Sequence, residues 1–452
     1  MLGLLLLGAA LAQPLPVPPP PAPLRLPEPI ASTLPGGGEA WLLARPEVPA
    51  FHLVVSLHHG SLVASDPLAL EQAATLLGLR GPEGRGWLRR QEAASARLLV
   101  EVDPWRTRLS LSGVRGAEDE AIALLGELLT VQDIDGRAWA RQRAEAVEQA
   151  RTAWLAPARV HLAALAQARY PTEHPFSRSP SARALARLRP GRLAQAWREA
   201  LQARADLVAV GDLDVDALLA RLGPMLTGSS APPPPTLPAP LPGPKVVLVD
   251  QPGDARALLS LSLPLPAGVR LEHPAIELLL RALVTDFDGR LTRLLREERG
   301  LVYALDGSVR SFSDHAWFEL RTSTEGAQAG ELLRLLRASL EELALRPPSG
   351  EERSPVQAGL RRDLARLLLS NQALAAHLVE RQALGLDAAR VWDDARAALQ
   401  ADDQALAAAA ALVEPERAIW VLSGDSALLD PAFAEAGLAV DRVETGWSLL
   451  PP

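Results

Sequence analysis

Apolar positions along the chain follow two periods, which predict alternating strands and helices. Short apolar runs bounded by Gly, Pro or Asp are typical of strands, and apolar residues at helical spacing are typical of helices. In the first part of the chain the expected strands cover residues 39–44, 51–57, 97–102, 107–111 and 206–210. The expected helices there cover residues 68–79, 118–129, 138–154, 159–169, 193–203 and 215–222.

The pattern stops at a proline-rich stretch, residues 227–244, and then resumes. Because this stretch offers few apolar side chains and many breakers, it is expected to be a linker. In the second part the expected strands cover residues 246–250, 257–263, 305–309, 317–323 and 419–422. The expected helices there cover residues 274–284, 329–343, 352–369, 371–384 and 388–399.

The two parts resemble each other. Each opens with a strand, a proline turn and a second strand, and Pro252 follows Pro46 by 206 residues. Each closes with a strand that ends in Gly-Asp, and Gly424-Asp425 follows Gly211-Asp212 by 213 residues. Similar offsets at both ends indicate a duplicated unit of roughly two hundred residues. Strands in hairpin-like pairs and helices in blocks favour the α+β class.

Composition narrows the class of protein. A chain of 452 residues that is 48% hydrophobic and 22% charged is globular and large enough for two or more domains. A net charge of −8 gives no electrostatic footprint for nucleic acid. The chain has no cysteine, which excludes thiol catalysis, disulfides and thiolate metal ligands.

The first residues, 1–12, form a short apolar run ending in Ala10-Leu11-Ala12, which is typical of a secretory signal with a small-residue cleavage site. The run is too short for a stable membrane span, and its first arginine comes only at Arg25. We therefore expect export to the periplasm or the medium; the alternative is a disordered apolar N-terminus. Residues 13–31 are expected to be a proline-rich spacer, followed by a first half over 32–226 and a second over 245–452.

One stretch of the second half combines local structure with chemistry. Residues 286–303, DFDGRLTRLLREERGLVY, predict a helix that ends at Gly300 and turns into an extended segment. Arg296 is then in the last helical turn and Tyr303 lies just beyond the turn. A guanidinium and a phenol so placed are suited to binding a carbonyl or an oxyanion. The alternative is a solvated charged helix face and a half-buried tyrosine.

Other chemistry has little support. The sequence contains no G-x-S-x-G and no P-loop. The motif S-x-x-K is also excluded, because the residue three positions before the single lysine, Lys245, is a proline. Asp286 and Asp288 precede a predicted helix, where carboxylates cap the N-terminus more often than they act as an acid pair. His58 and His59 are adjacent at a strand end, so their side chains point to opposite faces, and a structural role is favoured over metal binding.

Several segments resemble the pitrilysin/insulinase family of zinc peptidases, in particular its processing-peptidase-like branch, over about residues 32–450. The opening hairpin and YPTEHPF in the first half are similar to family segments. LVAVGDLD and VVLVDQPGDARALLSLSLP resemble the strands that close the first half and open the second. The most specific match is GRLTRLLREERGLVYAL, which resembles the family's arginine, glycine and tyrosine signature.

The resemblance implies two homologous halves, each a pair of α/β sandwich domains, that form a clamshell around an extended peptide. It also implies a zinc motif, H-x-x-E-H, on a helix of the first half. Here that motif is replaced, because Gln72, Thr75 and Leu76 stand at the positions of the first histidine, the glutamate and the second histidine. Glu145 and Glu148 lie where a further ligand is expected, but a carboxylate alone does not make a zinc site.

The resemblance therefore implies a protein that has no catalytic residues or metal of its own and keeps Arg296 and Tyr303 for substrate binding. The first hypothesis is a non-catalytic subunit that forms a heterodimer with an active homologue, which supplies the zinc, and helps to bind the peptide substrate. The second is a peptide-binding or scaffold protein with no peptidase partner. A hydrolase with a new site is a third and weaker hypothesis.

Overall fold

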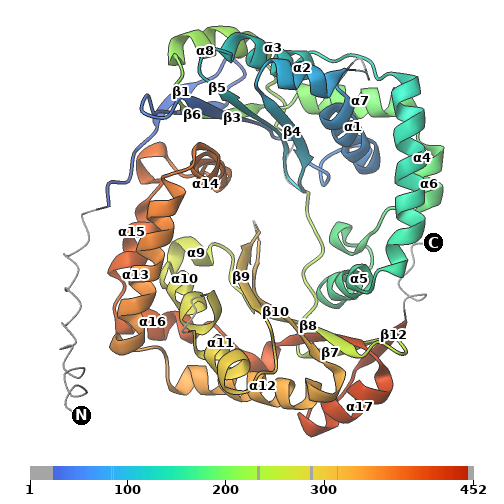
Figure 1. Ribbon diagram of the computed structural model, residues 1–452, viewed down its shortest axis with the longest axis vertical. Helices are drawn as coiled ribbons and strands as arrows, with labels where there is room; N and C mark the ends of the chain where they lie inside the picture. Colours follow the sequence, from blue (N-terminus) through green and yellow to red (C-terminus); the bar gives the residue numbers. More distant parts are fainter. Residues whose placement is uncertain are drawn as a thin grey trace, which may run out of the picture.

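Two six-stranded sheets, each packed against helices, form the two halves of the protein (Figure 1). The computed structural model describes residues 24–82, 84, 86–231, 235–285, 289–312 and 314–445. The expected signal segment, residues 1–12, lies outside this part of the chain, as do Asp286 and Asp288. Among the described residues, no helix combines the length and apolar character needed to cross a membrane.

The first half contains six strands and eight α-helices in its described residues. The strands are β1 (Ile30–Thr33), β2 (Glu39–Ala44), β3 (Ala50–Leu57), β4 (Arg97–Val102), β5 (Thr107–Val114) and β6 (Ala205–Gly211). The helices are α1 (Pro67–Arg80), α2 (Trp87–Ala93), α3 (Glu118–Leu129), α4 (Gly136–Thr152), α5 (Pro157–Arg169), α6 (Ala182–Arg187), α7 (Pro190–Leu201) and α8 (Val215–Leu222).

The second half repeats this sequence of elements with a modified helical block. Its strands are β7 (Lys245–Asp250), β8 (Arg256–Leu265), β9 (Leu305–Ser311), β10 (Ala316–Glu325), β11 (Ile419–Gly424) and β12 (Arg442–Thr445). Its helices are α9 (Val269–Glu272), α10 (Ala275–Leu280), α11 (Arg290–Thr292), α12 (Ala329–Leu345), α13 (Gly350–Leu367), α14 (Asn371–Ala383), α15 (Asp393–Gln400), α16 (Asp403–Ala410) and α17 (Ser426–Glu435).

Strand order confirms the duplication. The first sheet runs β1-β2-β6-β3-β5-β4 and the second runs β12-β7-β11-β8-β10-β9, so every strand has a counterpart. The β2–β6 and β7–β11 pairs are parallel, and the inner pairs that follow them are antiparallel in both sheets. The outermost strands differ, because β1 pairs antiparallel with β2 whereas β12 pairs parallel with β7. The α+β class, the two halves and the clamshell architecture are confirmed. Each half contains one sheet, however, so the pair of α/β units is made by the halves themselves.

The central strands of each sheet are apolar on both faces, and the two faces bury their side chains in different places. In β6, Leu207 and Ala209 join the core beneath the first half's own helices, whereas Val208 and Val210 join the core of the second half. In the second sheet, Leu248 of β7 packs toward its own helices, and Val247 and Val249 pack with residues of α5. Alternation along a strand sends successive side chains to opposite faces, so each sheet requires cover from both sides.

The second face of each sheet is covered by a helix from the other half. Helix α5 of the first half packs on β7 and β11, and α14 of the second half packs on β3 and β6. These helices occupy equivalent places in the duplication, since α5 follows α4 as α14 follows α13. Figure 1 shows α4 and α5 on one side of the molecule, and α13 and α15 on the other, running between the two sheets. The halves are therefore joined by a reciprocal exchange of helices.

Polar contacts fix the register of α5 on the second sheet. Both ring nitrogens of His161 are within hydrogen-bond distance of serine hydroxyls, 2.7 Å from Ser423 and 2.8 Å from Ser260. At the end of the helix, Arg169 donates to Glu319 of β10 at 2.7 Å, and both side chains are almost fully buried, with 6% and 1% exposed. Such a pair requires close alignment of its partners, because each charge loses its water.

Helix α14 is held on the first sheet by backbone carbonyls. Asn371, at its start, donates to the carbonyl of Ala50 at 2.8 Å and accepts from Arg45 at 3.0 Å. Near its end, Gln382 donates to the carbonyl of Glu39 at 3.1 Å. The two ends of α14 are thus tied to the connection between β2 and β3 and to the start of β2, two strands that β6 separates in the sheet.

The described end of the expected spacer is packed against the second half. Trp392 donates to the carbonyl of Pro27 at 2.7 Å, and Arg396 pairs with Glu28 at 3.2 Å. Leu24 and Leu26 pack against the second core, while β1 begins at Ile30 in the first sheet. Residues 24–29 therefore form a further connection between the halves, which a flexible spacer would not provide.

We predict that Glu319→Ala lowers the free energy of unfolding by about 3–5 kcal/mol. The substitution leaves Arg169 buried without its carboxylate and also removes the partner of Arg321, 2.6 Å away. The matched control is Glu342→Ala, which breaks an exposed pair with Arg346 and is expected to cost less than about 0.5 kcal/mol. Urea denaturation of both variants checks this, and equal losses would contradict a special role for the buried pair.

Acid should weaken the contact between α5 and the second sheet. Burial lowers the pKa of His161 to about 4, from an ordinary value of 6.5, so the folded chain resists a proton that the unfolded chain accepts. Stability is therefore lost as the pH falls from 6.5 toward 4, by up to about 3 kcal/mol from this group. Urea midpoints across this range should change less in His161→Gln than in the parent; parallel pH profiles would contradict the assignment.

Candidate functional site

The corner that carries Arg296 and Tyr303 starts from a short helix with strong anchors. Arg290, the first residue of α11, makes a bidentate pair with Glu352 of α13, with nitrogen–oxygen distances of 2.5 and 2.6 Å. Thr292 donates to the carbonyl of Val284 at 2.7 Å. Leu291 and Leu295 are fully buried, as their spacing predicts. This segment is therefore fixed to the body of the second half by its ends and by its apolar face.

The helix does not continue as an α-helix, which is a departure from the prediction. After Thr292 the backbone becomes a π-helix over Arg293–Glu298. A second π-helical turn covers Arg281–Thr285, at the end of α10. A π-turn widens the helix and shifts side chains relative to an α-helical register, and such turns are frequent at functional sites. Arg296 thus belongs to a distorted turn rather than to a regular last turn.

Gly300 ends the helix, as predicted, in a left-handed conformation with φ of +63°. The amide of Leu301 donates to the carbonyl of Leu295 at 2.8 Å, and the amide of Arg299 donates to that of Leu294 at 3.1 Å. A Cβ on Gly300 would meet no atom within 4 Å, so its backbone angle, and not a shortage of space, calls for glycine. The chain reverses here at a defined angle.

Beyond the reversal, the chain is buried before it is exposed. Leu301 and Val302 are buried, and the carbonyl of Leu301 accepts from the hydroxyl of Thr324 at 2.8 Å. Tyr303 is then 86% exposed, and β9 begins only at Leu305, later than the expected extended segment. The tyrosine is therefore presented from an anchored loop and is not half-buried in a strand, as the alternative interpretation required.

Arg296 is also accessible, with 37% of its side chain exposed, and its Nε lies 3.3 Å from Glu297. It stands before Gly300 and Tyr303 stands after it, on the two arms of one corner. A guanidinium offers several fixed donors and a phenol one rotatable donor, which together suit the carbonyl oxygens of a peptide. Whether they bind peptide remains a prediction.

The positions of the missing zinc motif all lie on α1. Leu76 is buried in the core of the first half. Thr75 is exposed, and its hydroxyl donates to the carbonyl of Glu71 one turn earlier, at 2.9 Å. Gln72 is half-buried, and its amide oxygen has no hydrogen-bond partner among the described residues. An amide, a hydroxyl and an aliphatic side chain offer no imidazole, so these three residues form no zinc-ligand set.

The neighbouring carboxylates do not change this conclusion. Glu145 of α4 accepts from Arg80, the last residue of α1, at 3.1 Å, so a cation occupies the place beside it. Glu148 lies one turn further on the same helix, 3.9 Å from Arg151. Within the part of the chain that the structure describes, no cluster of three or more His, Asp and Glu residues is suited to hold a metal ion.

His58 and His59 separate, as expected for adjacent residues at a strand end. His58 is within 2.5 Å of Asp206, which also accepts from Arg106 at 3.3 Å. His59 is buried, and burial lowers its pKa, while its carbonyl accepts from Thr107 at 2.7 Å. One histidine thus belongs to a charged network at the start of β6, and the other to the core.

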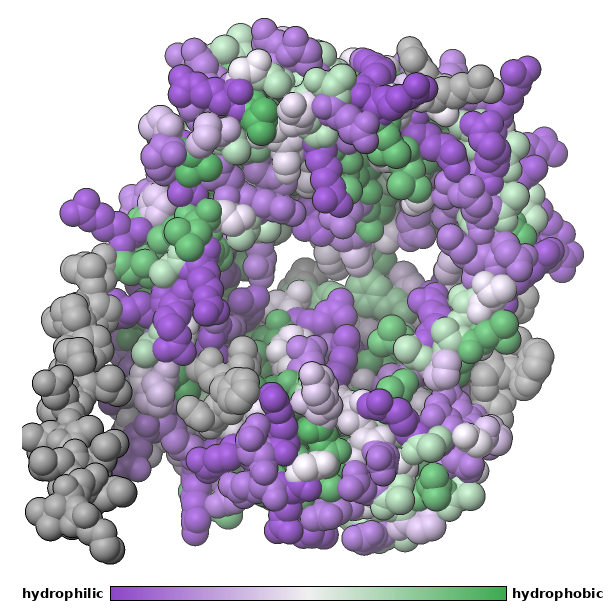
Figure 2. All heavy atoms as spheres, in the orientation of Figure 1, coloured by the Kyte–Doolittle hydropathy of each residue, from purple (hydrophilic) through white to green (hydrophobic). Residues whose placement is uncertain are grey.

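The degenerate zinc helix and the Arg296 corner belong to opposite halves. Figure 1 shows α1 beside the first sheet and α11 beside the second, on different sides of the molecular centre. In the space-filling view, the surface between the halves is hollowed and interrupted by openings (Figure 2). The structure therefore separates the two sets of predicted site residues into different structural units, each with its own anchors.

Sequence reasoning missed the polar groups that join the halves, above all Arg169 with Glu319, which lie 150 residues apart. A signal was present, because α5 and β10 each carry a charge inside an apolar pattern. The sequence does not indicate, however, that these two charged residues contact each other. The cluster of ionised residues between α10, α13 and α14 was also not predicted.

Comparison with known families and structures agrees with the expected resemblance. Residues 201–360 match the family model described as the peptidase M16 inactive domain, which confirms the resemblance to the pitrilysin/insulinase peptidases. No curated protein sequence matches the chain. The match covers the end of the first half and the first part of the second, and the sequence itself contains no H-x-x-E-H.

Three solved structures illustrate the shared fold. The peptidase M16 inactive domain from Pseudomonas fluorescens is 18% identical, with 88% of this chain and 98% of that chain covered and a TM-score of 0.77. The first half of the periplasmic protease PqqL from Escherichia coli is 15% identical, with 92% and 99% covered and a TM-score of 0.68. A chain of complex III2 from Candida albicans is 13% identical, with 90% and 99% covered and a TM-score of 0.67.

The comparison with PqqL also relates the lengths of the two chains. Against the longer PqqL structure, at 17% identity and a TM-score of 0.68, 88% of this chain is covered but only 45% of that chain. This chain thus spans about half the length of that protease. These likenesses concern the fold alone, because all the identities are low.

We predict that the purified chain binds no zinc at α1. Dialysis against a chelator should leave its melting temperature unchanged, because Gln72 and Leu76 offer no imidazole. Metal analysis after dialysis against zinc should find no stoichiometric ion. A stoichiometric zinc that is lost in Glu145→Gln would contradict the prediction and reveal a rearranged site.

Proposed function

We propose that this non-catalytic homologue of the M16 peptidases is a subunit of an exported zinc peptidase. It pairs with an active homologue, which carries the zinc, and it helps to bind the peptide substrate through Arg296 and Tyr303. The observation that carries the proposal is the corner itself. An exposed tyrosine and an accessible arginine stand on two arms of a reversal that is anchored on both sides.

The anchored backbone of the corner favours binding by its two side chains. A side chain on a fixed backbone loses little entropy when it binds, so its hydrogen bonds contribute more to affinity. The side chain of Tyr303 is 86% exposed, so its aromatic ring contributes almost no buried apolar surface to the stability of the fold. It gains burial and a hydrogen bond when a peptide or a partner covers it. A solvated helix face would not need a reversal fixed at Leu301 and Thr324.

Length supports a partner. The chain covers 99% of the first half of PqqL and 45% of the longer PqqL structure, so that protease contains more than one unit of about this size, and the proposed partner is a second such unit. A partner with H-x-x-E-H would also supply the general base and the zinc ligands that α1 lacks. The proposed location outside the cytoplasm rests on the apolar residues 1–12 and on the periplasmic relative.

The second candidate is a scaffold or peptide-binding protein with no peptidase partner. The likeness to a chain of complex III2 supports it, because that fold is there part of a larger assembly. The two candidates differ in their partner. A pull-down from the native host followed by mass spectrometry, together with a search for a neighbouring reading frame with H-x-x-E-H, separates them.

We predict that adding the chain to its active partner raises peptide cleavage and that two substitutions lower it. Arg296→Ala removes a charged donor and should reduce kcat/KM about tenfold, whereas Tyr303→Phe removes a neutral one and should reduce it about threefold. Neither should change the melting temperature, because both side chains are accessible.

The matched control is Arg299→Ala, which removes an exposed arginine next to Gly300 that pairs with Glu331 at 3.6 Å. It should leave cleavage within about twofold of the parent. Unchanged cleavage in both Arg296→Ala and Tyr303→Phe would remove the role given to the corner. Cleavage by the purified chain alone, with bound zinc and loss on chelation, would overturn the non-catalytic assignment.

A further inference from the structure

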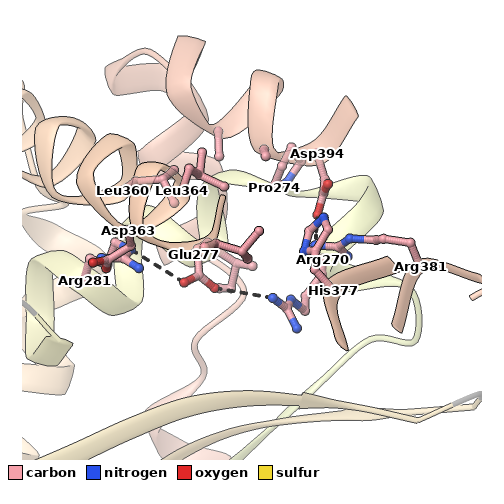
Figure 3. A pocket seen from close by; sticks show the side chains of 14 residues that line it. Arg270, Pro274, Glu277, Arg281, Leu360, Asp363, Leu364, His377, Arg381 and Asp394 are labelled. Carbon is pink, nitrogen blue, oxygen red and sulfur yellow. Dashed lines mark hydrogen bonds and ion pairs between the residues drawn. The ribbon is translucent and has the colours of Figure 1, made fainter. Parts of the chain in front are cut away.

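A cavity of about 180 Å³ lies in the second half, away from the Arg296 corner. It is lined by residues of α9, α10, α13, α14 and α15 and by Arg281 of the π-helical turn after α10, and Figure 3 shows their charged side chains around it. Its size is below the 300–1,000 Å³ typical of pockets for drug-sized ligands. Any ligand it accepts is therefore small.

Three arginines and three carboxylates line the cavity, so its fixed charges balance. Arg281 pairs with Asp363 at 2.7 Å and with Glu277 at 3.6 Å. Arg270 lies 3.8 Å from the same glutamate (Figure 3). Arg381 pairs with Asp394 at 2.7 Å. A lone anion or cation that entered this low-dielectric space would leave an uncompensated charge, which is costly.

The ion pair of Arg381 and Asp394 has polar atoms that lack hydrogen-bond partners among the described residues. Arg381 is only 4% exposed, yet its Nε and Nη1 have no hydrogen-bond partner among the described residues. The Oδ1 of Asp394 and the Nε2 of His377 are likewise without one there. Buried polar atoms are nearly always satisfied, so a group of unsatisfied donors and acceptors beside a cavity calls for an explanation. Donors and an acceptor sit side by side, on the two members of one ion pair.

His377 adds a polar group but no charge. Its ring stacks on Trp392 with centroids 4.3 Å apart, and burial lowers its pKa to about 4, so the imidazole is neutral at pH 7. The remaining wall is apolar. It is formed by Ile276, Leu360, Leu364, Leu367, Ala395 and Ala398.

We propose that this cavity binds a small zwitterion with an aliphatic side chain, that is, a free aliphatic amino acid. The ligand carboxylate accepts hydrogen bonds from Nε and Nη1 of Arg381, and its ammonium group donates to Oδ1 of Asp394. A zwitterion leaves the charge balance of the cavity unchanged. Its side chain packs against the leucines of α13. The proposal does not depend on Arg296, Tyr303 or a peptidase partner.

The test is calorimetric titration of the purified full chain with L-leucine. We expect one leucine bound per chain, together with a rise in melting temperature. L-leucinamide lacks the carboxylate and N-acetyl-L-leucine lacks the ammonium group, and each should bind at least about tenfold more weakly. Equal binding of all three compounds would overturn the zwitterion assignment. No heat and no thermal shift with millimolar leucine would mean that the cavity holds only water, which also overturns the proposal.

Variants locate the bound amino acid. Asp394→Asn should weaken leucine binding at least about tenfold, because the ammonium group loses its carboxylate. The matched control is Asp393→Asn on the same helix, which pairs with Arg390 and Arg396 outside the cavity and should bind normally. Ala395→Leu fills the cavity without touching the ion pair, and it serves if Asp394→Asn does not fold. Unweakened binding in Ala395→Leu would place leucine elsewhere and refute the site.

Discussion

The structure depends on the exchange of α5 and α14 between the halves. The central strands of each sheet are apolar on both faces, and the helices of its own half cover only one of them. Val208 and Val210 of the first sheet would face water without α14, and Val247 and Val249 of the second would face water without α5. Neither half is therefore a complete folding unit, in spite of the duplication. The exchange turns two repeats into one body.

The polar groups of this interface give it specificity that apolar contact lacks. Buried aliphatic surfaces tolerate small sliding movements, but His161 reaches its two serines only in one register, and Arg169 meets Glu319 only at one helix position. A hinge inside this chain would have to open both helix contacts and the connection made by residues 24–29. These contacts therefore hold the two sheets together as one unit.

Most of the regular structure could be predicted from the sequence, for identifiable reasons. The helices over 118–129 and 215–222 have the observed bounds, and Gly300 ends its helix as a left-handed residue. Helix α17 was missed because Pro431 interrupts its pattern, and β12 because four residues at a sheet edge give little signal. The π-helix at Arg293 could not be predicted, since its apolar spacing is that of an α-helix.

The candidate site could be predicted only in part. The loss of the zinc motif at Gln72 and Leu76 can be read directly, because a ligand set is defined by residue type at fixed spacing. The accessibility of Tyr303 could not, because it depends on where β9 begins and on the anchor at Thr324. The cavity beside Arg381 could not be predicted from the sequence at all. Its six charges come from six elements, namely α9, α10, the π-helical turn at Arg281, α13, α14 and α15, and no local pattern states which distant charges meet.

The two sets of predicted site residues are held by separate contacts in the fold. The helix α1 folds on its apolar side chains, so replacing a histidine by Leu76 adds a core residue and leaves the rest of the helix in place. The Arg296 corner is anchored through Arg290, Thr292 and Leu301, whose side-chain and carbonyl hydrogen bonds go to Glu352, Val284 and Thr324 of the second half. Each set of residues is therefore held in place by its own contacts. Residue types on α1 can therefore change without altering the contacts that hold the corner.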